Sequence, residues 1–219
     1  ESDRMGHLLG AIDRAALDEQ RGVVQNEKRQ GENEPYGRMG EQELAETYPA
    51  NHPYHHDTIG SMADLNAASL EDVKQWFRDY YGAANTVVVL AGDVTPAQAR
   101  EKMLRYFGDI GPGPRVPHPQ PWVAPRTTST RGTMTDNVAQ VRIYREWNVP
   151  PRTDAEIDPL KLAAAVLGGG KTSRLYQRLV VRDKLADSVS VDIEPHALAS
   201  LFELQVDVKQ GVDPARVEA

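Results

Sequence analysis

Apolar and charged residues are mixed in several stretches of the chain, and helix caps or breakers bound these stretches. Ser69 is a candidate N-cap, followed by acidic Glu71 and Asp72, and Gly82 marks the end of that segment. Pro96 occupies the first position of another such segment, where proline favours the start of a helix. The pattern predicts helices over residues 14–30, 41–48, 69–82, 96–108, 154–169 and 171–185.

Two other patterns predict strands. TVVVLAG (86–92) is a continuous apolar run rich in β-branched residues, which favours a strand buried on both faces. SLFELQVDVKQ (200–210) alternates, with Phe202 and Leu204 on one side and Glu203 and Gln205 on the other, so one face should meet solvent. A further strand is expected over 138–149. Together the elements predict an α+β protein with helices packed on mostly antiparallel sheets.

A proline-rich segment divides the chain. GPGPRVPHPQPWVAP (111–125) contains six prolines and two glycines, which disfavour regular elements and stiffen an extended path. We expect a first domain over 1–111, a linker over 112–130 and the beginning of a second domain over 131–219. The chain opens without Met and stops in DPARVEA, typical of a first helical turn, so we expect a piece of a longer protein, with both domains incomplete.

Composition narrows the function classes. The 219 residues are 40% hydrophobic and carry a net charge of −7, which supports a packed core and argues against nucleic-acid binding. The absence of cysteine removes disulfides, thiolate metal ligands and cysteine nucleophiles, but it leaves the compartment open. No apolar run reaches the length of about 18 residues that a membrane-spanning helix needs.

Two motifs suggest sites that their context does not favour. NHPYHHDTIG (51–60) holds His52, His55 and His56, but in a proline-containing stretch without the Glu of a metalloprotease helix. Packing or surface exposure is therefore the main alternative to metal binding. GGGKTS (168–173) resembles a phosphate loop, yet the position that needs glycine is Ala165 and a helix precedes it, so a tight packing turn is favoured.

Glu27 is a third candidate. At 100° per residue it shares a helical face with Gln20, Val23 and Val24, which predicts a carboxylate on an apolar stripe. A buried carboxylate needs a metal, a cation or a proton. A salt bridge to an arginine, or an exposed helix edge, would account for Glu27 equally well.

The segment LDEQRGVVQNEKRQ (17–30) resembles the region of the third zinc ligand in the M16 metallopeptidases, in their bacterial zinc-protease branch. The resemblance continues in order through NHPYHHDTIGSMADLNAASLEDVKQWFRDYYGAANTVVVLAGDV, FGDIGPGP and GGGKTSRLYQRL, and so covers nearly the whole chain. It implies two tandem domains of one type, each incomplete here.

The resemblance also implies a zinc endopeptidase chemistry. In that family an upstream H-x-x-E-H helix provides two Zn²⁺ ligands and the general base, and a later Glu completes the site. Glu27 matches this third ligand, with Arg21 and Gln20 as candidate supporting residues around it. No H-x-x-E-H occurs in these 219 residues. We therefore expect no catalytic residue in this fragment, which should neither retain Zn²⁺ nor hydrolyse peptides alone.

A final comparison concerns the partner. Halves of this family that lack zinc carry an Arg and a Tyr seven residues apart for holding substrate, whereas Val180 and Asp187 stand there in this chain. This difference implies a zinc-bearing half that works with a second M16-type half on short or unfolded peptides, with the periplasm favoured over the cytoplasm. Two alternatives remain: a non-catalytic structural or substrate-holding subunit, and metal sequestration by the histidine stretch.

Overall fold

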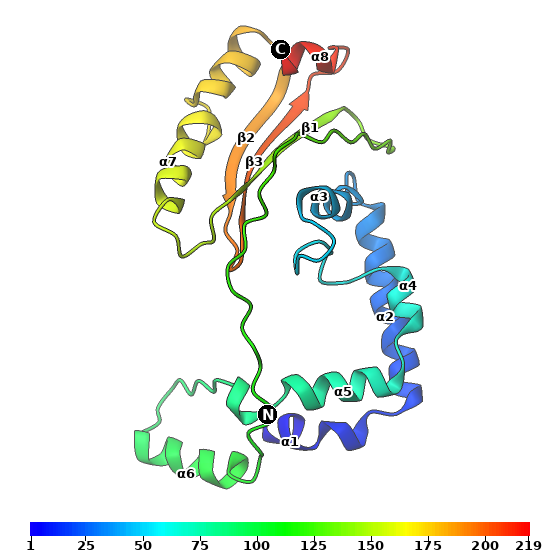
Figure 1. The fold of residues 1–219 in the computed structure, drawn as a ribbon, viewed down its shortest axis with the longest axis vertical. Helices are drawn as coiled ribbons and strands as arrows, with labels where there is room; N and C mark the ends of the chain where they lie inside the picture. The colour runs from blue at the N-terminus through cyan, green and yellow to red at the C-terminus, as the bar shows by residue number, and fades with distance from the viewer. The chain divides into compact units, whose positions relative to one another are not determined.

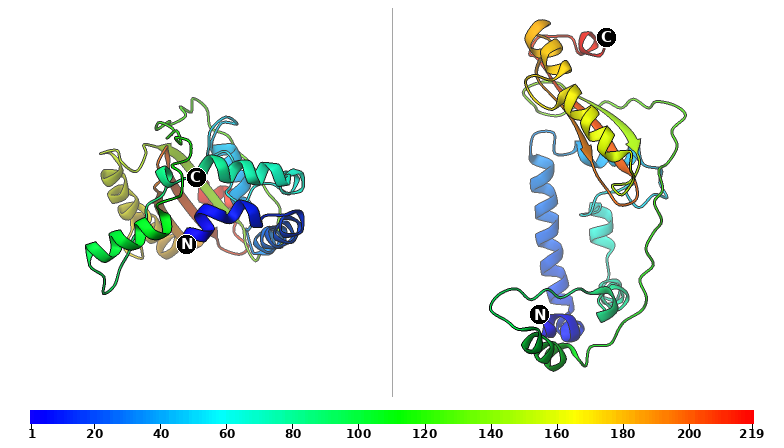
Figure 2. Two further views of the ribbon diagram at one scale, coloured as in Figure 1. Left: turned by 90° about the horizontal axis from the view of Figure 1, so that it is seen from below. Right: turned by 90° about the vertical axis from the view of Figure 1, so that its left-hand side faces the viewer.

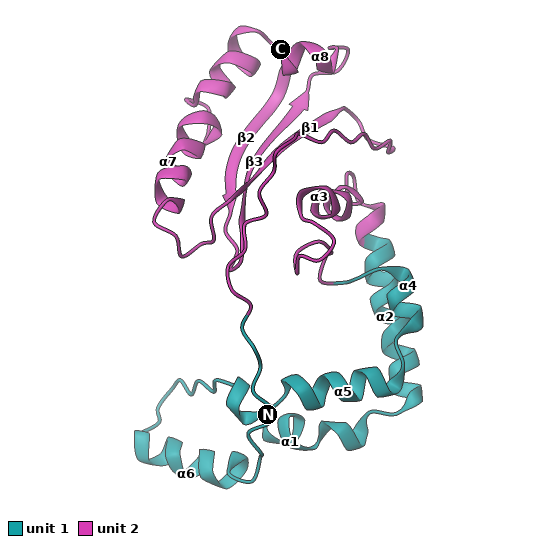
Figure 3. Cartoon of the chain, viewed as in Figure 1, with its two compact units in different colours: residues 1–30, 59–118 teal, residues 31–58, 119–219 magenta.

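The computed structural model describes residues 1–219, which form two compact units (Figure 3). Unit 1 comprises residues 1–30 and 59–118, and unit 2 comprises residues 31–58 and 119–219. The change of unit at residues 118–119 lies within the proline-rich segment. Residues 31–58, however, belong to the same unit as the end of the chain. The division into two M16-type domains stays a prediction.

Unit 1 is helical (Figure 1). Ser69 caps α5 in a reciprocal capping box with Asp72, and Thr95 does the same for α6 with Gln98, so local sequence signals define both starts. These helices and α2 confirm the predictions, whereas α1 and α4 were not predicted. The elements are α1 Ser2–Ala11, α2 Arg14–Asn33, α4 Met62–Ala67, α5 Leu70–Tyr80, the short 3₁₀ helix η1 Ala83–Asn85 and α6 Pro96–Phe107.

The predicted strand over 86–92 is wrong. The segment has no regular structure, and Val87 and Val89 are 88% and 82% exposed. A strand is stabilised by hydrogen bonds to a neighbour, and unit 1 contains no strand that could pair with it. The β-branched composition of this run is therefore not sufficient by itself to form a strand.

Unit 2 contains a three-stranded antiparallel sheet in the order β1-β3-β2. The predicted strand over 200–210 is confirmed as the central β3, and that over 138–149 is confirmed with a later start. The strand β2 was not predicted, although Val189, Val191 and Ile193 alternate with polar residues there. The elements are α3 Met39–Thr47, β1 Arg142–Val149, α7 Ile157–Gly168, the π-helical η2 Tyr176–Arg182, β2 Ala186–Glu194, β3 Ser200–Val208 and α8 Pro214–Glu218.

One face of this sheet is apolar and covered by helices. The helix α7 runs along it, and η2 lies against β2 (Figures 1 and 2). Leu179 of η2 packs with Val189 and Val206 in the larger buried cluster. Burial of these branched side chains supplies the main apolar stabilisation of unit 2. Both helical predictions for 154–185 are confirmed, the second with π geometry.

The opposite face is polar, as the alternation in β3 predicted, but it is not fully exposed to solvent. The helix α3 packs against β1, and Tyr48, directly after α3, is 2% exposed. Tyr48 packs with Ala199 and Leu201, and Leu44 of α3 joins this second cluster. The prediction of one wet face is therefore wrong where α3 covers the sheet.

Candidate functional site

The candidate metal ligand Glu27 is exposed on α2. It shares an open helical face with Gln20 and Val23, as the spacing predicted, but not with Val24; Gln20 is exposed and Val23 is 52% exposed. The packed face instead carries Arg21, Val24 and Lys28, of which Lys28 is 7% exposed. The expectation that Glu27 lies on a buried stripe is wrong, because a seven-residue spacing identifies a shared face without showing which face is packed.

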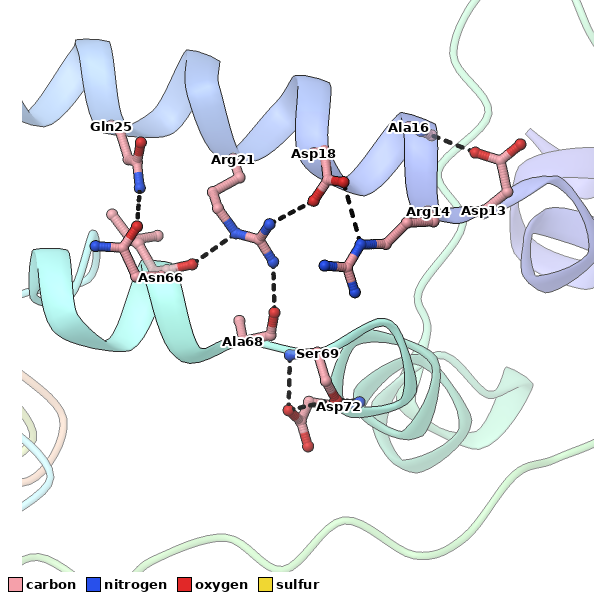
Figure 4. A network of polar contacts seen from close by, with 11 residues as sticks. Asp13, Arg14, Ala16, Asp18, Arg21, Gln25, Asn66, Ala68, Ser69 and Asp72 are labelled. Atoms are coloured by element: carbon pink, nitrogen blue, oxygen red, sulfur yellow. Dashed lines mark hydrogen bonds and ion pairs between the residues drawn. The ribbon is translucent and has the colours of Figure 1, made fainter.

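Arg21 fixes α2 to the joint between α4 and α5 (Figure 4). Its guanidinium donates to the Leu65 carbonyl at 2.8 Å and to the Ala68 carbonyl at 2.5 Å, and it pairs with Asp18 at 2.5 Å. The side chain is only 16% exposed. The two carbonyls lie at the end of α4, where backbone acceptors lack helical partners. Arg21 therefore satisfies these acceptors and holds the helix that carries Glu27.

A second contact strengthens this joint. The Gln25 side chain donates to the Asn66 side chain at 2.8 Å, one turn of α2 beyond Arg21 (Figure 4). Together the two contacts set the rotation of α2 about its axis, so that Glu27 stays accessible. No group of three or more His, Asp or Glu side chains in the structure is placed to hold a metal ion. Glu27 could supply one oxygen ligand, and the other ligands of a zinc site would have to come from elsewhere.

The histidine stretch contains a packing residue rather than a free ligand at His52. His52 is 2% exposed, and its ring stacks on Tyr48 with a centroid distance of 4.6 Å. Its Nδ1 accepts from the Tyr54 backbone N–H at 3.0 Å, so its Nε2 carries the proton and donates to the Trp122 carbonyl at 3.0 Å. Both ring nitrogens are thus occupied. His55 donates through Nδ1 to the Tyr48 carbonyl at 2.7 Å, and His56 is exposed.

The glycine motif has a packing function, as its context indicated. A Cβ on Gly168 would lie 2.4 Å from the backbone nitrogen of Val191, so glycine lets the end of α7 approach β2. Gly170 has φ +120°, a conformation that residues with side chains rarely adopt. The motif therefore turns the chain tightly between α7 and η2.

Val180 and Asp187, which stand at the positions compared with the Arg and Tyr pair, lie in different surroundings. Val180 packs against the larger core cluster from η2. Asp187 is exposed at an irregularity in the pairing of β2 with β3, between Ala186 and Ser188.

The polar face of the sheet contains charged groups that the sequence analysis did not single out. Strand register places Glu146, Glu203 and Asp192 side by side on β1, β3 and β2, and these three residues are named the carboxylate row. Burial raises the pKa of Glu203, and the neighbouring charges of Glu146, Glu194 and Asp192 raise it further. No local motif could reveal this row, because the register of three strands creates it.

Asp207 on the same face is a carboxylate whose charge is compensated by direct hydrogen bonds. Asp207 accepts hydrogen bonds from Arg142 and from Ser188, both at 2.6 Å, in line with their neighbouring positions on the three strands. Burial opposes ionisation of Asp207, but these hydrogen bonds outweigh it and hold its pKa below the usual value. Arg142 also lies over the Tyr36 ring, 3.8 Å from its centroid. This arginine is therefore already engaged at its own end of the sheet.

Comparisons with known proteins define the class of protein. Residues 67–219 match the family described as the peptidase M16 inactive domain, so the chain belongs to the M16 peptidase family. It is 28% identical over 173 residues to the zinc protease PqqE of Helicobacter pylori, covering 76% of this chain and 38% of that protein. It is 24% identical over 145 residues to the non-peptidase homolog YmxG of the same organism, covering 65% of this chain and 33% of that protein. The chain thus spans well under half the length of these curated relatives.

Solved structures share the fold. The peptidase M16 inactive domain from Pseudomonas fluorescens superposes with a TM-score of 0.78 at 18% identity, over 94% of this chain and 49% of that one. The periplasmic protease PqqL from Escherichia coli gives a TM-score of 0.61 at 13% identity, over 90% of this chain and 22% of that one. The mixed helix and antiparallel-sheet architecture expected from the sequence is confirmed. None of the helices combines the length and apolar content needed to cross a bilayer.

Proposed function

We propose that this chain is part of the zinc-bearing half of an M16 metalloendopeptidase that hydrolyses short or unfolded polypeptides. The observation that carries the proposal is the accessible carboxylate of Glu27 on a helix whose rotation Arg21 sets. A metal ligand must reach an ion held by other residues, and second contacts must keep its helix in place. The match to a zinc protease over 76% of the chain supports the same assignment.

In this proposal Glu27 supplies one of three protein ligands, and an H-x-x-E-H segment elsewhere in the longer protein supplies the others and the general base. Zinc in such a site lowers the pKa of its bound water to about 7 and polarises the scissile carbonyl. Arg21 and Gln25 act as positioning residues for α2, whereas Gln20 is exposed beside Glu27 and can only hydrogen-bond.

A second function has a specific observation in its favour. The similarity to a non-peptidase homolog, and to a domain family described as inactive, fits a structural or substrate-holding subunit. The inactive-domain match, however, begins at residue 67 and does not include Glu27. It therefore describes the part of the chain in which no ligand is proposed, and we favour the zinc-bearing half.

The partner and the compartment belong to the same proposal. A second M16-type half, fused or separate, would supply the substrate-holding Arg and Tyr that Val180 and Asp187 do not provide. The periplasm is proposed because the chain shares its fold with a periplasmic protease. Both parts would be tested by purifying the longer protein from cell fractions and identifying proteins that co-purify.

The zinc assignment is tested in the longer protein by zinc analysis and peptide hydrolysis. Glu27→Gln should lose bound zinc and activity while its circular dichroism spectrum stays unchanged. Glu19→Gln, an equally exposed carboxylate on α2, is the matched control and should behave as the wild type. Normal zinc content in Glu27→Gln would eliminate Glu27 as a ligand. A wild-type protein without zinc or activity would favour the non-catalytic subunit.

A further inference from the structure

The packing of α3 on the sheet brings two carboxyl groups together. Glu43 lies one turn of α3 before Thr47, which contacts Glu146 of β1, and the Glu43 carboxyl group interacts with Glu146 at one end of the carboxylate row. Two ionised carboxylates are both acceptors and repel each other, so a close buried pair is favoured when one of them carries a proton.

Thr47, at the end of α3, shows by its contacts how closely α3 approaches Glu146. Its hydroxyl lies 2.6 Å from the Glu43 backbone carbonyl and 2.7 Å from Glu146 Oε2, and it donates to both in a shared hydrogen bond. Thr47 is only 5% exposed, so water has little access to this contact. Glu43 lies one turn before Thr47 on the same face of α3, and the Thr47 contact therefore places the Glu43 side chain beside Glu146.

The charged groups around Glu43 do not offer another means of neutralising it. From the sheet it faces Glu146, Glu203 and Glu194, with Asp192 beside Glu203, and these groups are all acidic. The His196 ring lies 3.4 Å from Glu194 and is paired with that carboxylate rather than with Glu43. Tyr48 after α3 and Tyr144 on β1 are the other titratable groups coupled to it. Burial raises the pKa of Glu43 to about 9, and the hydrogen bond with Glu146 and the surrounding negative charges contribute.

The arginines near α3 are engaged with other groups. Arg38, directly before α3, donates to the Thr135 carbonyl at 2.9 Å and pairs with Asp136 at 3.1 Å. Arg142 pairs with Asp207 at 2.6 Å and lies over Tyr36. Arg126 donates to the Glu46 carbonyl at 2.9 Å and to the Thr130 hydroxyl at 2.6 Å. These contacts leave a proton as the charge-balancing species for Glu43.

We propose that the contact between α3 and the sheet is a pH-dependent device, closed while the Glu43–Glu146 pair holds a proton and opened when that proton is lost. Opening would separate two carboxylates and release Tyr48 from Ala199 and Leu201, together with the His52 ring stacked on it. This inference does not depend on the proposed peptidase function, because none of its residues is a proposed zinc ligand.

The direction in which pH changes the closing equilibrium follows from the linkage between proton binding and closure. A raised carboxyl pKa in the closed state means that the closed state binds the proton more tightly than the open state does. Its contribution to closure is complete below the ordinary value of 4.5 and is lost as the pH rises toward about 9. A single proton can change the closing equilibrium by at most about tenfold per pH unit.

Amide hydrogen exchange of the 219-residue chain, corrected for the intrinsic pH dependence of exchange, would test the proposal. Protection of residues 39–48 should fall by at least about tenfold between about pH 6 and about pH 9, and by clearly more than the protection of β2 and β3. In Glu43→Gln the side-chain amide can donate to Glu146 without titrating, so protection should become nearly independent of pH. Glu46→Gln, the same change at an exposed position of α3, should keep the wild-type profile.

Three results would overturn the proposal. The first is wild-type protection of α3 that does not change between about pH 6 and about pH 9. The second is a Glu43→Gln profile identical to that of the wild type, with Thr47→Val measured beside it in case the first variant folds poorly. The third is closure that requires magnesium or calcium and disappears with a chelator, because a metal cation would then be the neutralising group.

Discussion

Gly168 and Val191 approach so closely that no larger residue fits at the end of α7. A Cβ on Gly168 would lie 2.4 Å from the Val191 backbone nitrogen and 2.5 Å from a methyl carbon of its side chain. The nearest atom is backbone, which a rotamer change cannot move. The GGGKTS motif is therefore explained by the distance between a helix and a strand, without a phosphate ligand.

Gly168→Ala should lower the free energy of unfolding by about 1–3 kcal/mol, the usual cost of forcing an extra carbon into a packed contact. Urea titration followed by circular dichroism would measure it. Gly22→Ala is the matched control, since a Cβ there meets nothing within 4 Å and Gly22 lies inside α2. The control should be neutral or stabilising by up to about 1 kcal/mol. Equal effects of the two substitutions would contradict the close-approach explanation.

Arg21→Lys should loosen the joint between α2 and the start of α5. An ammonium is a compact donor and cannot reach the Leu65 and Ala68 carbonyls and Asp18 together as the planar guanidinium does. We expect a loss of about 1–3 kcal/mol in local stability, seen as faster hydrogen exchange over α4 and the first turn of α5.

Arg14→Lys provides the control for this prediction. Arg14 pairs with Asp18 at 3.1 Å but is 70% exposed, so its replacement should change stability by less than about 0.5 kcal/mol. If the Arg14 and Arg21 variants exchanged at the same rates over α4, the Arg21 contacts would not be the ones that fix α2.

The helices could be predicted because their signals are local. Ser69 and Asp72, or Thr95 and Gln98, lie three residues apart and form their capping hydrogen bonds within one turn. The run over 86–92 shows the opposite case. Its β-branched residues favour a strand, but a strand also needs a hydrogen-bonding neighbour, and unit 1 contains none.

At the candidate site, too, local sequence signals predicted what long-range packing did not change, and failed where packing decides. Helical spacing correctly placed Glu27 with Gln20 and Val23, but Val24 lies on the packed face with Arg21. Which face packs depends on where α4 lies, and the spacing alone does not show this. The pairing of Glu43 with Glu146 was invisible in the sequence, because the two residues are 103 positions apart and meet only through the register of the sheet and the docking of α3. His52 was correctly favoured as a packing residue.

Glu203→Gln should stabilise unit 2 at alkaline pH. Burial and the charges of Glu146, Glu194 and Asp192 raise the pKa of Glu203, so keeping it ionised in the folded state is unfavourable. Wild-type stability should therefore decrease as the pH rises above the ordinary range of a glutamate, and the variant should decrease less. Urea midpoints measured at about pH 5 and about pH 8 would show the difference. Asp187→Asn, at an exposed position of β2, should reproduce the wild-type pH dependence, and a Glu203→Gln variant that did so would contradict the prediction.

His52→Ala should destabilise unit 2 without altering metal binding. The substitution removes a buried ring stacked on Tyr48 and leaves the Trp122 carbonyl without its 3.0 Å donor, which should cost about 2–4 kcal/mol. Urea unfolding monitored by circular dichroism would report the loss, and tryptophan fluorescence would add a signal to which Trp122 contributes, with its ring centroid 4.8 Å from that of His52. His56→Ala, at an exposed position, should shift stability by less than about 0.5 kcal/mol.

Zinc titration of the chain should give the same weak binding for the wild type and both variants. Stoichiometric, tight zinc binding that only His52→Ala abolished would instead show that the ring can leave its packed position to act as a ligand.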